Sequence, residues 1–187
     1  MLWIQQLRSA NWSLAGWISL FSYLLGCFTT GYYLVRARLG RDIRALGSGS
    51  VGARNVGRVL GRLGFSVTLA GDFGKGAFVM WAAPHFTTDG RLLGLAMLAV
   101  VVGHIWPAQL RFHGGKGVAT SLGALLLYDY HLAVAFAILF AAGQSLPGTG
   151  AGQRPNRNRR SFIARRGRAD RASQEFDGGN FALPGAA

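Results

Sequence analysis

The chain has 187 residues, of which 50% are hydrophobic and 14% are charged, and 20 basic against 7 acidic residues give it a formal net charge of +13. An ordinary soluble domain carries about 25% charged residues, so this composition excludes a typical cytosolic globule. The hydrophobicity also excludes a disordered chain, and the single cysteine excludes an intramolecular disulfide and a cysteine-rich metal site.

The first apolar segment, residues 9–35, contains no charged side chain. It exceeds the ~20 residues that cross a bilayer and the ~7–15 apolar residues of a cleavable signal peptide. We therefore expect a retained membrane span here. A second uncharged segment, residues 92–110, has the length of a single crossing.

Two further apolar segments contain charges. Residues 64–86 include Asp72 and Lys75, which would share a helix face and neutralise each other inside the protein. Residues 118–142 include Asp129, which would cost about 3 kcal/mol at the centre of a single span. The sequence therefore favours two short helices, 118–128 and 131–142, that turn around Asp129. Together the segments predict an all-α fold, a polytopic integral membrane helical bundle.

The basic residues predict the orientation of this bundle. Residues 36–62 hold seven arginines and one acid, and the loop 111–117 adds Arg111 and Lys116, whereas the opposite side has only Arg8 and Arg91 as basic residues. Lys and Arg are enriched in cytoplasmic loops. We therefore expect loops 36–63 and 111–117 to be cytoplasmic and the N-terminus to be outside.

Both predicted cytoplasmic loops contain residue types that bind anions. Residues 47–58 hold four glycines, Asn55 and two arginines, a combination that can approach a phosphate closely. A glycine-rich linker with ordinary cytoplasmic arginines is the alternative reading. The second loop, Gly114-Gly115-Lys116-Gly117 before a predicted helix, resembles a phosphate cradle without the Walker A spacing. Two such loops on one membrane face favour a phosphate site.

These motifs resemble a known family. The matching residues, in order, are Gly47-Ser48-Gly49, Asn55, Arg58, Gly71-Asp72, Lys75-Gly76, Gly103-His104, Pro107, Phe112 and Gly114 to Thr120. Their order and spacing over roughly residues 12–143 are similar to the bacterial acyl-phosphate:glycerol-3-phosphate acyltransferase (PlsY) family. The resemblance implies a multi-pass enzyme of the cell inner membrane. Such enzymes transfer an acyl group from acyl phosphate to the 1-hydroxyl of glycerol 3-phosphate, giving lysophosphatidic acid and phosphate, and use no cofactor or metal.

The resemblance also implies roles for individual residues. Ser48 and Arg58 match residues that hold the glycerol phosphate, and Asn55 matches a residue that shapes the loop. The phosphate-binding loop of the second motif corresponds to Gly114, Gly115, Lys116 and Gly117, with Thr120 inside the following helix. Lys116 and Arg58 are the catalytic candidates, because both substrates carry phosphate and charge stabilisation can supply much of the catalysis. Lys75 and His104 are further candidates, and for His104 a packed interfacial histidine is the alternative. Ser50 and Arg54 stand where the family usually has Asn and Thr.

The sequence predicts two domains, an acyltransferase-like membrane domain over residues 1–143 and an Arg/Gly-rich tail over 144–187. The tail has eight arginines, three acids and no apolar stretch long enough to span a membrane. Family members continue here with further helices and a third, serine-containing motif, so a reading-frame change or an unrelated extension is expected. An inactive truncated relic or a non-catalytic phospholipid-binding membrane protein is therefore the alternative function. We expect a disordered tail near anionic membrane phospholipids, and nucleic acid is not an expected partner.

Overall fold

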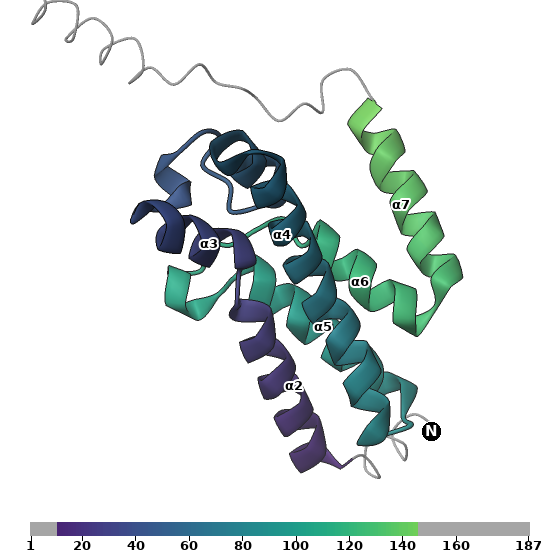
Figure 1. Ribbon diagram of the computed structural model, residues 1–187. Coiled ribbons are helices and arrows are strands. Elements are labelled where there is room, and N and C mark those ends of the chain that lie inside the picture. Colours follow the sequence, from purple (N-terminus) through teal and green to yellow (C-terminus); the bar gives the residue numbers. More distant parts are fainter. Residues whose placement is uncertain (1–10, 146–187) are drawn as a thin grey trace, which may run out of the picture. The chain divides into compact units, whose positions relative to one another are not determined.

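The computed structural model describes residues 11–145, and every regular element in this part of the chain is helical (Figure 1). The helices are α2 (Trp12–Cys27), α3 (Thr30–Leu39), α4 (Ala53–Ala82), α5 (Gly90–Ile105), α6 (Val118–Tyr128) and α7 (Tyr130–Ser145), with the short 3-10 turns η1 (Ile43–Ala45), η2 (Ala83–His85) and η3 (Ala108–Leu110). The all-α prediction is confirmed for these residues. The predicted boundary after residue 143 falls in the last turn of α7, and residues 146–187 of the predicted tail lie outside the described residues.

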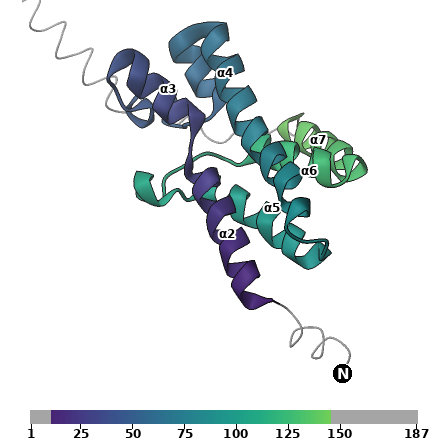
Figure 2. The same cartoon turned by 60° about the horizontal axis from the view of Figure 1, so that its bottom comes forward.

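Glycines bring the central helices into close contact. Helices α2 and α5 lie side by side (Figures 1 and 2), where a β-carbon at Gly26 would collide with the Val100 carbonyl and one at Gly103 with the Tyr23 carbonyl. Helix α4 meets α6 in the same way, with Gly76 against the backbone of Thr120. Small residues at such crossings are typical of membrane helices, which gain packing from close backbone approach.

The first apolar segment is not one continuous helix. Helix α2 ends at Cys27 and α3 begins at Thr30, with Phe28 and Thr29 in extended conformations. The span expected over residues 9–35 therefore consists of two helices joined by a break, within a stretch, Trp12–Leu39, that is apolar and long enough to cross a membrane. The cause is a pair of buried charges on α4: Lys75 Nζ donates to the carbonyls of Gly26 and Phe28 at 2.9 and 2.8 Å, and the Thr30 amide donates to Asp72 at 3.3 Å. These contacts replace hydrogen bonds that a continuous helix would make.

The predicted break at Asp129 is confirmed. Helix α6 ends at Tyr128, and the Asp129 side chain then accepts hydrogen bonds from the His131 amide at 2.8 Å and the Leu132 amide at 3.4 Å. Asp129 is thus the N-cap of α7, a role in which a carboxylate satisfies amides that have no partner within the helix.

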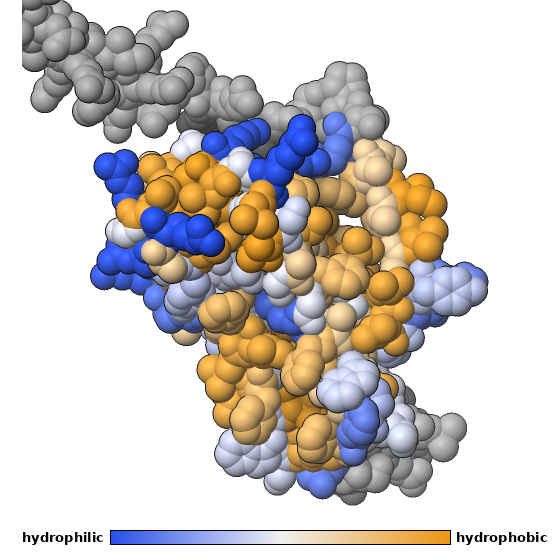
Figure 3. Space-filling model, viewed as in Figure 1, coloured by the Kyte–Doolittle hydropathy of each residue, from blue (hydrophilic) through white to orange (hydrophobic). Residues whose placement is uncertain are grey.

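Length and composition identify two stretches of the described chain that are apolar enough to cross a membrane, Trp12–Leu39 and Gly90–Leu110. Large apolar side chains remain exposed along the helices, among them Phe21 on α2 and Trp81 on α4. Figure 3 shows hydrophobic residues over much of one face, whereas hydrophilic residues gather around α3 and the start of α4. The candidate functional loops lie at this hydrophilic end.

Candidate active site

Asn55 organises the first glycine-rich loop. Its side chain is 1% exposed, and Nδ2 donates to the carbonyls of Leu46 and Ser50 at 3.0 and 2.8 Å, while Oδ1 accepts from the Ser48 amide at 2.8 Å. Gly47, with φ +56°, lies directly against Asn55 Oδ1 and has no room for a β-carbon. The loop is therefore a fixed turn built around one buried amide, and Ser48 is exposed on its outer side.

The basic residues of this motif lie on a helix and not in a flexible linker. Helix α4 begins at Ala53, so Arg54 and Arg58 occupy its first turns, and both are exposed. Together with Arg62 they line an open pocket of about 540 Å³. The backbone of Gly61 in the pocket wall has φ +76° and interrupts the helix there. Three guanidinium groups around one pocket suit a phosphate ligand.

The second motif is anchored to the end of α5. The Gly114 amide donates to the Ile105 carbonyl and the Gly115 amide to the His104 carbonyl, each at 3.0 Å. These two amides are therefore not free to bind an anion, which differs from the simple cradle expected from the sequence. The first amides of α6, which starts at Val118 after Gly117 with φ +77°, have no acceptor within the helix and remain as donors.

The two remaining residues of this motif differ in exposure. Lys116 is exposed beside the start of α6. Thr120 is fully buried in the first turn of α6, and its Oγ1 has no hydrogen-bond partner in the described part of the chain. A cation and an unpaired hydroxyl thus flank the helix N-terminus.

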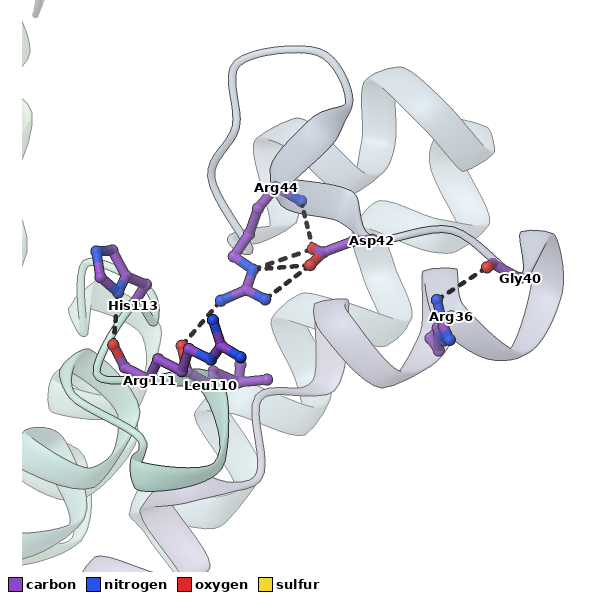
Figure 4. A network of polar contacts seen from close by, with 7 residues as sticks. All are labelled: Arg36, Gly40, Asp42, Arg44, Leu110, Arg111 and His113. Atoms are coloured by element: carbon purple, nitrogen blue, oxygen red, sulfur yellow. Dashed lines mark hydrogen bonds and ion pairs between the residues drawn. The ribbon is translucent and has the colours of Figure 1, made fainter.

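Arg44 joins the two loops, a role that the sequence did not reveal. Its guanidinium is paired with Asp42 at 2.7 Å, and its Nη1 donates to the Leu110 carbonyl at 2.8 Å (Figure 4). The hydrogen bond from Arg44 holds the pKa of the Asp42 carboxyl below its usual value, and the pKa of Arg44 is correspondingly raised. The chain between α3 and α4 is therefore tied to the turn that precedes Gly114.

Three buried ionisable side chains lie behind the second loop. Lys75 Nζ is 3.2 Å from Asp72 Oδ1 and 2.7 Å from His104 Nδ1, and all three residues are less than 10% exposed. The i,i+3 spacing predicted the Asp72–Lys75 pair, and the pair is confirmed. Nothing in the spacing indicated that His104, from another helix, completes the cluster. Within residues 11–145, no group of three or more His, Cys, Asp or Glu side chains is arranged to hold a metal ion.

Comparison with known proteins identifies relatives over most of the described chain. The sequence model of the family described as glycerol-3-phosphate acyltransferase matches residues 16–146. Glycerol-3-phosphate acyltransferase 1 of Desulfitobacterium hafniense (strain Y51) is 50% identical over 130 residues, which cover 67% of this chain and 64% of that protein. The protein of the same name from Bacillus cereus (strain ATCC 10987 / NRS 248) is 44% identical over 119 residues, covering 64% of this chain and 65% of that protein.

A solved structure has the same fold. The crystal structure of PlsY (YgiH), an integral membrane glycerol 3-phosphate acyltransferase, in its glycerol 3-phosphate form is 36% identical and superposes with a TM-score of 0.62, covering 70% of this chain and 66% of that chain. Its lysophosphatidic acid form gives 34% identity and a TM-score of 0.59 over 69% of this chain and 64% of that chain.

The match thus spans about two thirds of the length of these relatives, 64% of the Desulfitobacterium protein. It includes both glycine-rich loops and the buried cluster between them. The likeness to an integral membrane protein identifies the helices as those of a membrane bundle. Because the family model covers residues 16–146, the chain belongs to the glycerol-3-phosphate acyltransferase family.

Proposed function

We propose that this protein transfers a fatty acyl group from acyl phosphate to the 1-hydroxyl of glycerol 3-phosphate. The hydroxyl oxygen attacks the acyl carbon, the bond from that carbon to the phosphate oxygen breaks, and the products are lysophosphatidic acid and phosphate. The released phosphate takes the hydroxyl proton, so the step needs no other base. Membership of the family, together with two phosphate-suited loops tied to each other by Arg44, is the observation that carries this proposal.

The residues divide between the two phosphates in this proposal. Arg58 and Ser48 hold glycerol 3-phosphate at the pocket on α4, with Asn55 fixing the turn that presents Ser48. Lys116 and the first amides of α6 receive the donor phosphate, where an ammonium group and a helix N-terminus both favour negative charge. Stabilising the charge that builds up on the leaving phosphate is the main catalytic contribution of such a site.

The proposed setting is the cell inner membrane, with loops 36–63 and 111–117 on the cytoplasmic side, where the soluble acceptor is available. Residues 1–143 form the membrane domain in this proposal, and residues 144–187 form an arginine-rich tail beside anionic phospholipids. Exposed apolar side chains along the helices and hydrophilic side chains around α3 support this placement.

The decisive experiment is an assay of the purified full chain in detergent with acyl phosphate and glycerol 3-phosphate. Release of phosphate together with lysophosphatidic acid, and no transfer from acyl-CoA, would support the proposal. A folded protein without turnover would instead favour the second candidate, a non-catalytic phospholipid-binding relic.

A further inference from the structure

The Asp72–Lys75–His104 cluster has a geometry that the proposed chemistry does not yet use. Lys75 Nζ lies within 2.9 Å of the carbonyl oxygens of Gly26 and Phe28, 3.2 Å from Asp72 Oδ1 and 2.7 Å from His104 Nδ1. Three oxygen acceptors, one of them a carboxylate, surround the amine. The Asp72 carboxylate favours the ammonium form of Lys75, whose three N–H donors face four acceptors, the three oxygens and His104 Nδ1.

The contact between Lys75 and His104 depends on the tautomer of the imidazole ring. Because an ammonium can only donate, an ammonium at Lys75 makes His104 Nδ1 the acceptor of their 2.7 Å contact. A neutral imidazole carries one proton, which must then reside on Nε2. The cluster thus turns the other edge of the ring into a hydrogen-bond donor.

The Nε2 edge faces the second glycine-rich loop. A β-carbon built on Gly115 would collide with Nε2, so the ring occupies the space where any other residue would place its side chain. His104 is 4% exposed, and its Nδ1 edge is the one that contacts Lys75, which leaves the Nε2 edge toward Gly115. The hydroxyl of Thr120, buried on the first turn of α6, is without a partner in the described part of the chain. A buried hydroxyl that lacks a partner is costly unless a ligand supplies one.

We infer that His104 is a phosphate-binding residue whose Nε2–H donates to an oxygen of the phosphate held at the start of α6. Lys75 is a positioning residue that fixes the tautomer, and Asp72 balances its charge. Gly115 is required because a side chain would separate the ring from the ligand. The inference rests on the proposed function for the class of ligand, a phosphate or phosphate monoester.

The first test reads the tautomer directly. Nitrogen NMR of the full chain with isotope-labelled histidine in detergent resolves the protonated and unprotonated ring nitrogens of the four histidines, and a His104→Gln sample assigns the signal of His104. We expect Nε2–H in the free protein and a shift of that signal on titration with inorganic phosphate or glycerol 3-phosphate. A proton on Nδ1, or no response to either anion, would overturn the inference.

The second test compares three variants by calorimetric titration with the same two anions. His104→Gln retains an N–H near the position of Nε2 and should keep affinity within about threefold, whereas His104→Leu should lose about 10- to 100-fold. The double variant Asp72→Asn/Lys75→Met removes both buried charges together, which avoids leaving one unpaired. We expect that in this variant the His104 ring loses its preference for a proton on Nε2. The affinity for the two anions should then fall as it does in His104→Leu, although no residue of the loop is changed.

The outcomes separate this inference from the proposed function. Anion affinity that depends on His104 in a chain without turnover supports the inference and not the acyltransferase proposal. Acyl transfer with equal anion affinity in His104→Gln and His104→Leu overturns the inference alone. Absence of both anion binding and turnover overturns both.

Discussion

Arg44 and Leu110 connect two parts of the chain that are 66 positions apart, through a 2.8 Å hydrogen bond from the guanidinium Nη1 to the backbone oxygen. The Asp42 carboxylate accepts three further hydrogen bonds from the guanidinium, and the ring of Tyr32 lies 5.4 Å away. The side chain is thus oriented before it reaches Leu110. Since the turn at Leu110 leads into Gly114, this contact sets the position of one phosphate-suited loop relative to the other.

The Arg44→Ala variant should therefore weaken the use of both substrates. We expect the KM values for glycerol 3-phosphate and acyl phosphate to rise together, and unfolding stability to fall by about 1 kcal/mol, because the pair is partly exposed. Steady-state kinetics and thermal unfolding in detergent measure the two effects. Arg41→Ala, an exposed arginine of the same segment, is the control. A change confined to one substrate would contradict a linking role.

The Asp42–Arg44 pair also predicts a pH dependence. The pKa of Asp42 is lowered by the hydrogen bond from Arg44, so its contribution to stability is fully present above the unfolded-state pKa of about 3.9 and is lost as the pH falls through the lower folded-state value. Between pH 7 and pH 5, stability from this pair should be constant. The difference in Tm between the parent and Asp42→Asn, followed down to about pH 3, should shrink only below about pH 4. A difference that already shrinks at pH 6 would assign the effect to another group.

Substitution of Arg58 should affect the KM values of the two substrates differently. Loss of one charge-assisted phosphate contact costs about 1.5–3 kcal/mol, so Arg58→Ala should raise the KM for glycerol 3-phosphate about 10- to 150-fold and that for acyl phosphate much less. The exposed position of Arg58 on α4 predicts little change in Tm. Unchanged kinetics would mean that the arginine pocket is a solvated helix face. Arg41→Ala again supplies the control for a lost surface charge.

The proposed orientation can be tested by cysteine labelling. Cys27 is buried, and Cys27→Ser removes its background. Single cysteines at Arg41 and His113 should react with an impermeant thiol reagent only after the membrane is opened, whereas one at Thr88, in the turn before α5, should react in intact spheroplasts. All three positions are exposed. Reaction of Arg41→Cys or His113→Cys from the outer side would contradict the proposed orientation.

The sequence predicted those features of the fold that depend on residues close together in the chain. A carboxylate in an apolar stretch predicted the break at Asp129, and i,i+3 spacing predicted the buried pair of Asp72 and Lys75. The break after Cys27 was not predictable in this way, because a lysine 47 positions beyond Phe28 causes it. The same holds for His104, which meets Lys75 from another helix.

The glycine-rich motifs were recognised from composition, yet the sequence did not show how their polar groups are used. Composition suggested that the amides of Gly114 and Gly115 form the cradle, but both are bonded to carbonyls at the end of α5. Likewise, the predicted loop over residues 47–58 is half helix, because α4 already begins at Ala53. In both motifs, tertiary or helical hydrogen bonds decide which donors remain for a ligand.

The last prediction concerns Gly115 and Lys116, whose substitutions should affect activity for different reasons. A β-carbon on Gly115 collides with His104 Nε2, so Gly115→Ala should displace the ring or the loop, lowering both acyl-phosphate use and Tm. Lys116 is exposed, and Lys116→Met should lower acyl-phosphate use about 10-fold or more while leaving Tm unchanged.

Gly94→Ala is the matched control for the glycine substitution. A β-carbon there meets nothing within 4 Å, and the position lies inside α5, so the change should preserve activity and keep or slightly raise Tm. Activity assays and thermal unfolding of the three variants require an active parent, which is the full chain or, if that is inert, a chain extended with the C-terminal helices of a relative. If such a parent tolerates both Gly115→Ala and Lys116→Met, the donor phosphate does not bind at this loop.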